Sequence, residues 1–132
     1  MKLLADTHTL LLLVDSTEHA RLPKPAKSAL LNPANELLVS AITPWEISLK
    51  NWLGRFPEGP LILEVWDTVI ARLRATVVPL TSQHGILAGR LDWLNKDPFD
   101  RMIAAQAIIE DASLVSADES FDAVQGVRRL WD

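Results

Sequence analysis

Short apolar runs alternate with longer segments of helical period along the whole chain. The short runs are bounded by turn residues, as is typical of buried strands, and they cover residues 2–5, 36–42, 76–80, 113–117 and 127–131. Between them apolar residues recur every three or four positions, which predicts helices over residues 7–15, 25–32, 43–56, 60–75, 82–94 and 98–111. Strands that alternate with helices favour a parallel sheet covered on both faces. The predicted fold class is therefore α/β.

Length and composition narrow the class of protein. The 132-residue length suits one domain with a substantial core, so a single domain over residues 1–132 is expected. The absence of cysteine excludes disulfide bonds and thiolate metal sites. A net charge of −4 does not mark a nucleic-acid binder. The longest apolar run near the N-terminus, residues 10–14, is too short for a signal peptide or a membrane span. We therefore expect a cytoplasmic protein with no membrane partner.

Two acidic residues follow predicted strands directly. Asp6 comes after the strand at 2–5, and Asp118 comes after the strand at 113–117. Ligands of open parallel sheets bind beyond the carboxyl ends of the strands. Both acids therefore belong to the same edge of the sheet, and they meet if the two strands are neighbours.

Two further acids stand near the start of predicted helices. In "TPWE", Thr43 would cap the helix and Glu46 would hold its third position; in "DPFD", Asp97 would cap and Asp100 would hold the third position. A capping box explains both patterns without any function. A helix that follows a strand also begins at the carboxyl edge of the sheet, however. Glu46 and Asp100 could thus join the two strand-end acids.

A cluster of four carboxylates needs a compensating group. Two unit charges about 4 Å apart repel by roughly 4 kcal/mol at an effective dielectric constant near 20. A shared proton, a basic side chain or a divalent cation could offset this repulsion. Oxygen ligands without Cys or clustered His favour Mg²⁺ or Mn²⁺, and such ions commonly serve phosphoryl or phosphodiester chemistry.

The order of these motifs resembles one known family over nearly the whole chain. "LLADTHTLLLL", "SAITPWEISLKNWLGRF", "VVPLTSQHGILAGRL", "NKDPFDRMIAAQAIIEDASLVSAD" and "VRRLW" are similar to successive blocks of PIN-domain proteins, and more narrowly of VapC-type toxins. The resemblance implies a three-layer α/β/α fold with about five parallel strands. It also implies a Mg²⁺- or Mn²⁺-dependent endoribonuclease, a homodimer, and inhibition by a cognate VapB-type antitoxin.

The resemblance also implies roles for individual residues. The metal-site acids, which are also the catalytic residues, would be Asp6, Glu46, Asp100 and Asp118.

Supporting roles are implied for three more residues. Ser116 would orient water or a ligand, Asp97 would cap a helix, and Arg101 would contact a carboxylate or a phosphate. The chain departs from the family at Asn95, where many relatives carry His. Asn can donate a hydrogen bond but cannot titrate near neutral pH, which puts a role of this position at the site rim in question.

Other interpretations of the chain stay open. A non-catalytic PIN-like module that binds RNA or a protein would have little reason to keep four clustered acids. A phosphohydrolase would carry a "DxDxT" motif, and a receiver domain would carry paired acids near its start; neither pattern is present. The chain has two pairs of nearby arginines, Arg72 with Arg74 and Arg128 with Arg129. They could contact RNA only if they lie near the acidic edge of the sheet.

Three tryptophans lie on the apolar faces of predicted helices: Trp45, Trp52 and Trp66. Core packing is the ordinary reason for such positions. The chain has five tryptophans, however, and Trp is enriched at protein interfaces. We therefore also expect Trp52 or Trp66 to line a dimer or antitoxin surface.

Overall fold

A five-stranded parallel sheet forms the centre of the molecule. The computed structural model describes all residues, 1–132. The sheet has the order β3-β2-β1-β4-β5, and every neighbouring pair is parallel. Its strands are β1 (Lys2–Ala5), β2 (Glu36–Ser40), β3 (Thr76–Val78), β4 (Ser113–Val115) and β5 (Arg129–Leu130). The α/β class and the parallel sheet expected from the sequence are confirmed, and β1 lies in the middle between β2 and β4.

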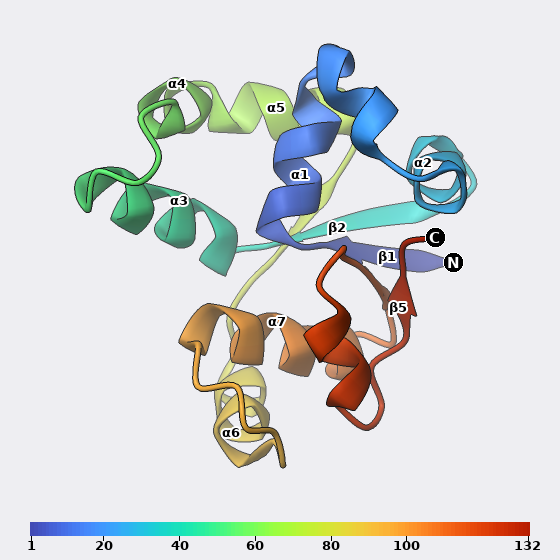
Figure 1. Ribbon diagram of the computed structural model, residues 1–132, viewed down its shortest axis with the longest axis vertical. Helices are drawn as coiled ribbons and strands as arrows, with labels where there is room; N and C mark the ends of the chain where they lie inside the picture. The colour runs from blue at the N-terminus through green and yellow to red at the C-terminus, as the bar shows by residue number, and fades with distance from the viewer.

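Helices cover both faces of the sheet, which gives three layers. Figure 1 shows α1 and α2 on one side of the strands and α6 and α7 on the other. The alternation within β1 explains the two cores: Leu3 and Ala5 pack with α1 and α2, whereas Leu4 packs with α7. The helices are α1 (Thr7–Val14), α2 (Lys24–Leu31), α3 (Ile42–Trp52), α4 (Gly59–Glu64), α5 (Trp66–Leu73), α6 (Ser82–Arg90) and α7 (Pro98–Ile109), with 3₁₀ turns η1 (Ser16–Arg21) and η2 (Glu119–Ala123).

Three predicted helices have the wrong extent. The helix expected over 43–56 is α3, which ends at Trp52. The segment 60–75 forms two helices, α4 and α5, that are separated at Val65. Gly59 holds α4 close to α3, because a Cβ there would lie 3.1 Å from both Asn51 and Phe56. The segment 82–94 is helical only to Arg90. Beyond Arg90, backbone carbonyls accept hydrogen bonds from the guanidinium of Arg101. These hydrogen bonds replace those of a last helical turn.

The tryptophans are more exposed than core packing would make them. Trp52 is 81% exposed and Trp45 is 55% exposed, although Trp45 also packs edge-on against Phe99 with ring centres 5.0 Å apart. Trp66 is half-buried. Core packing is therefore wrong for Trp45 and Trp52, and their use as an interface stays a prediction. None of the helices is long and apolar enough to cross a bilayer.

Candidate active site

The sheet order brings the strand-end acids together. Because β1 pairs with β4, Asp6 and Asp118 leave neighbouring strands at the same edge. The backbone N–H of Asp6 donates to the carbonyl of Val115 at 3.2 Å, so the two strands stay paired up to the acid. A cavity of about 570 Å³ opens at this edge, and all four predicted acids line it: Asp6, Glu46, Asp100 and Asp118.

Asp6 and Asp118 each cap the turn that follows their strand. The Asp6 carboxylate accepts the backbone N–H of Thr9 at 2.8 Å at the start of α1. The Asp118 carboxylate accepts the N–H of Ser120 at 2.9 Å at the start of η2. In each carboxylate only one oxygen, Oδ1, has a hydrogen bond from the protein. The caps therefore fix both side chains at the cavity and leave an oxygen of each for a ligand.

Ser116 supports Asp118 through the backbone. Its side chain is fully buried, and its hydroxyl accepts the N–H of Asp118 at 3.0 Å. Ser116 does not line the cavity. Its contacts thus fix the turn that carries Asp118, and its orientation of a water or ligand stays a prediction.

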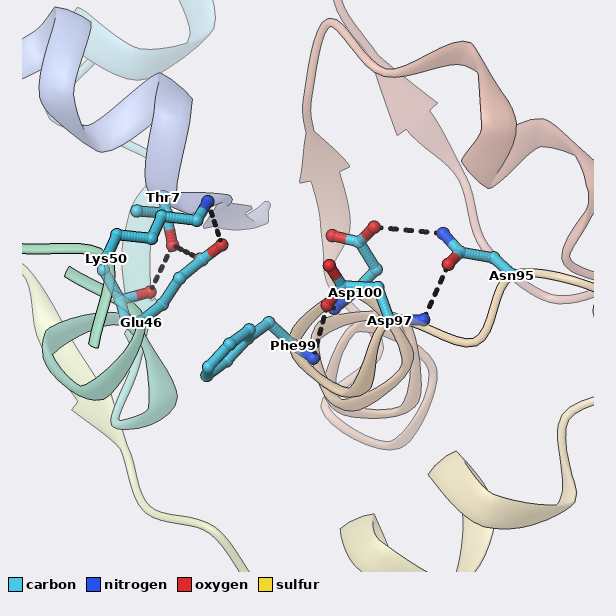
Figure 2. A network of polar contacts seen from close by, with 8 residues as sticks. Thr7, Glu46, Lys50, Asn95, Asp97, Phe99 and Asp100 are labelled. Carbon is cyan, nitrogen blue, oxygen red and sulfur yellow. Dashed lines mark hydrogen bonds and ion pairs between the residues drawn. The ribbon is translucent and has the colours of Figure 1, made fainter. Parts of the chain in front are cut away.

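Glu46 is held by a buried hydrogen-bond network rather than by a capping box. Helix α3 begins at Ile42 without a side-chain cap, so Thr43 lies inside the helix and does not cap it. Glu46 is only 6% exposed. It accepts a hydrogen bond from the hydroxyl of Thr7, which is itself hydrogen-bonded to that of Thr43 at 3.2 Å, and another from the Lys50 ammonium at 2.7 Å (Figure 2). A capping box therefore does not explain Glu46, because its carboxylate faces the cavity.

Asp97 caps a helix, whereas Asp100 belongs to the cavity; the sequence had left both roles open for these acids. Asp97 caps α7 and accepts the N–H groups of Phe99 at 2.8 Å and Asp100 at 3.2 Å, as predicted. The Asp100 carboxylate does not return to the cap. Its Oδ2 accepts the side-chain amide of Asn95 at 3.0 Å instead (Figure 2). Asp100 therefore belongs to the cavity, and Asp97 to the helix terminus.

The cavity raises the pKa of Asp100 to about 6 from an ordinary value of 3.8. Burial is the main cause, because desolvation disfavours the carboxylate. The Asn95 amide opposes this effect by donating to the charged form, whereas the negative charges of Asp97, Asp118 and Glu46 add to the rise. The raised pKa therefore reports mainly that Asp100 is partly desolvated, with a smaller contribution from the neighbouring carboxylates.

Asp100→Asn is expected to stabilise the protein in the absence of metal. The raised pKa means that the folded state holds the Asp100 proton more tightly than the unfolded state, so stability is lost as the pH rises from about 4 to about 6. After a discount for partial exposure, the loss amounts to about 1–2 kcal/mol at neutral pH. The variant avoids this loss. Its melting temperature in EDTA should exceed that of the wild type by about 3–8 °C at pH 7 and by little at pH 4.

The same melting experiment tests for a cation. Mg²⁺ or Mn²⁺ should raise the melting temperature of the wild type more than that of Asp100→Asn, since a bound ion stabilises the state that binds it. If the difference in melting temperature between the variant and the wild type were the same at pH 4 and pH 7, the pKa of Asp100 would not be raised in the folded protein.

The contacts of Arg101 differ from the prediction. Its guanidinium donates to four backbone carbonyls and to no carboxylate. It also does not line the cavity. Arg101 thus holds the loop between α6 and α7, and it would lose these hydrogen bonds if it turned to contact a phosphate.

Two basic residues bring positive charge to the cavity. Lys50 and Arg55 both line it. By contrast, Arg128 pairs with Asp111, and Arg129 pairs with Asp122. The arginine pairs considered from the sequence do not line the acidic cavity.

Thr7 and His84 are residues whose structural roles the sequence analysis missed. Thr7 follows Asp6 and could have been found as a hydroxyl at the same strand end. His84 is buried, and it closes a capping box with Thr81 while its Nε2 lies 3.2 Å from a Glu110 oxygen. That pattern belongs to the packing of α6 on α7 and lies outside the cavity.

The donor set of the cavity suits a hydrated divalent cation. The candidate ligands are carboxylate oxygens, which Mg²⁺ and Mn²⁺ prefer. No three acidic or histidine side chains are grouped closely enough to hold a metal ion by themselves. Mg²⁺ commonly keeps several waters and uses one or two carboxylates. The residues therefore fit an ion that retains water, rather than a closed protein cage.

The fold and the cavity together define a class: a parallel α/β domain with a carboxylate site at the ends of its central strands. The family model of the PIN domain matches residues 3–127, so the chain belongs to the PIN-domain family. A search of the curated proteins finds no match.

Two solved structures share the fold. One is VapBC2 from Rickettsia felis bound to a DNA fragment from its promoter, with a TM-score of 0.70, 17% identity and 100% of each chain covered. The other is VapBC-1 from nontypeable Haemophilus influenzae, with a TM-score of 0.65, 20% identity, and coverage of 98% of this chain and 97% of that one.

Proposed function

We propose that this chain is the toxin of a VapBC-type pair, a Mg²⁺- or Mn²⁺-dependent endoribonuclease that hydrolyses RNA phosphodiester bonds. The observation that carries the proposal is the convergence of Asp6, Glu46, Asp100 and Asp118 on one cavity at the edge of the sheet. The PIN-domain match and the likeness to VapBC complexes support it.

The four acids would hold one or two divalent ions, with Asp6 and Asp100 as direct ligands. A bound ion supplies an activated water and polarises the phosphate. The free oxygen of Asp118, which is exposed, is suited to accept a proton from that water. Lys50 and Arg55 would attract the phosphate groups of the RNA, because they bring the positive charge that lines the cavity.

Partners are part of the proposal. A VapB-type antitoxin would cover the site, and two copies of the chain would form a homodimer in the cytoplasm. The exposed rings of Trp45 and Trp52 offer apolar surface to either partner.

Cleavage of a total-RNA mixture by purified, partner-free protein tests the activity. We expect discrete fragments with Mn²⁺ or Mg²⁺ and intact RNA with EDTA, because the acids need a cation to act. Asp6→Asn, purified identically, controls for a contaminating nuclease. The ends of the fragments would identify the RNA and the sequence that is cut.

The second function, a non-catalytic module that binds RNA or a protein, makes a different prediction. The ion pair between Glu46 and Lys50 favours this second function, because it neutralises part of the acidic cluster without a metal ion. RNA that stays intact, together with protein that fails to bind Mn²⁺, would select this module over the nuclease.

A further inference from the structure

Asn95 is held at three points in the loop before α7. Its backbone carbonyl accepts a guanidinium N–H of Arg101 at 2.8 Å, and its side-chain Oδ1 accepts the backbone N–H of Asp97 at 2.8 Å. Its Nδ2 donates to the Asp100 carboxylate at 3.0 Å. Since the Asp97 N–H can only donate, it requires the amide oxygen on its side and so turns the NH₂ group towards Asp100. The orientation of the amide is therefore set by the backbone.

Arg101 fixes the loop that presents Asn95. Its Nε donates to Ala88 at 2.9 Å, Nη1 to Trp93 at 2.8 Å as well as to Asn95, and Nη2 to Leu91 at 2.7 Å. All four acceptors are backbone carbonyls. The planar guanidinium has five N–H donors in a rigid arrangement, so these bonds constrain the loop against the end of α6 and the start of α7.

The link between this loop and the cavity is the hydrogen bond from Asn95 to Oδ2 of Asp100. Asp100 accepts its only side-chain hydrogen bond at Oδ2, from Asn95, so Oδ1 has no hydrogen-bond partner in the protein. The Asp100 side chain lines the cavity, whereas Asn95 does not. Figure 2 shows Asn95 to the right of Asp100, on the opposite side from Glu46 and Lys50.

We propose that Asn95, held by the guanidinium of Arg101, is a positioning residue that fixes the Asp100 carboxylate for cation binding in the cavity. The proposal rests on the proposed function. Mutation of an outer group that orients a metal ligand typically lowers metal affinity or activity by about 10- to 100-fold. Asn95 acts through Asp100 and needs no contact with the ion or with RNA.

Asn95→Ser separates positioning from loop structure. A serine hydroxyl can still accept the N–H two residues later, in the same kind of turn, and the backbone carbonyl still meets Arg101. The shorter side chain does not reach Asp100, however. Asn95→Ala removes both side-chain bonds, and Lys96→Ala changes an exposed neighbour as a matched control.

Mn²⁺ binding to the full chain, measured by loss of the free-ion electron paramagnetic resonance signal, is the test. Asn95→Ser and Asn95→Ala should raise the Mn²⁺ dissociation constant by about tenfold, and Lys96→Ala should leave it unchanged. The melting temperature of Asn95→Ser in EDTA should exceed that of Asn95→Ala, since serine keeps the turn.

The outcomes separate this proposal from the proposed function. Wild-type affinity in both Asn95 variants, with or without a lower melting temperature, would assign Asn95 to loop structure alone and overturn the positioning role, while leaving the nuclease intact. Failure of the wild-type protein to bind Mn²⁺ would overturn both.

Discussion

Asp100→Asn is expected to lower the rate of RNA cleavage by at least about a thousandfold, whereas Asp97→Asn should lower it by less than about threefold. The two substitutions are chemically identical and lie three residues apart. Asp100 lines the acidic cavity, and its carboxylate meets the charges of Glu46 and Asp118 there. Asp97 accepts two backbone N–H groups at the start of α7 and does not line the cavity.

The physical reason for the difference is charge. An asparagine at 100 keeps the shape of the side chain and an oxygen that can accept from Asn95, but it cannot neutralise a cation. An asparagine at 97 keeps the cap, because Asn caps helices about as well as Asp. Cleavage should be measured as single-turnover rates at saturating Mn²⁺, with melting temperatures for both variants. Equal losses in the two variants would show that the start of α7 matters only for folding.

The fold was predictable because its signals are local. Short apolar runs separated by helical periods imply a parallel sheet, and the sheet then places Asp6 and Asp118 at one edge. Only the strand order was missing, and the pairing of β1 with β4 supplies it. The acids of the strand ends could thus be located from sequence before any contact was known.

The acids of the helix starts could not be interpreted in the same way. "TPWE" and "DPFD" look alike, yet Asp97 caps its helix and Thr43 does not. Helix α3 begins before Thr43, and the hydroxyl of Thr7 contacts both Thr43 and Glu46 from another element. A partner 39 residues away in the chain leaves no local pattern.

The loop before α7 shows the same limit for helix boundaries. The segment 82–94 has a helical period, but the helix ends at Arg90. Carbonyls that would have continued it accept hydrogen bonds from Arg101 instead. A basic residue directly after the acids of "DPFD" suggests a carboxylate or phosphate partner. Only the three-dimensional structure shows that Arg101 contacts four backbone carbonyls instead.

Arg101→Ala is expected to lower the free energy of unfolding by about 3 kcal/mol, although Arg101 contacts neither the cavity nor another charge. The substitution leaves four carbonyls without their donor, and one of them belongs to Ala88, which is buried. Arg101→Lys should recover less than half of this loss, because an ammonium lacks the planar set of donors.

Arg128→Ala is the matched control for this prediction. Arg128 also donates to a carboxylate and a carbonyl, both of Asp111, but the pair is on the surface, with side chains 59% and 86% exposed. Its loss should therefore cost less than about 1 kcal/mol. Urea unfolding at pH 7 in EDTA measures all three variants without any contribution from metal binding. If Arg101→Ala proved no more destabilising than Arg128→Ala, water would be replacing the guanidinium at the carbonyls, and the loop before α7 would owe its shape to Asp97 and Asn95 instead.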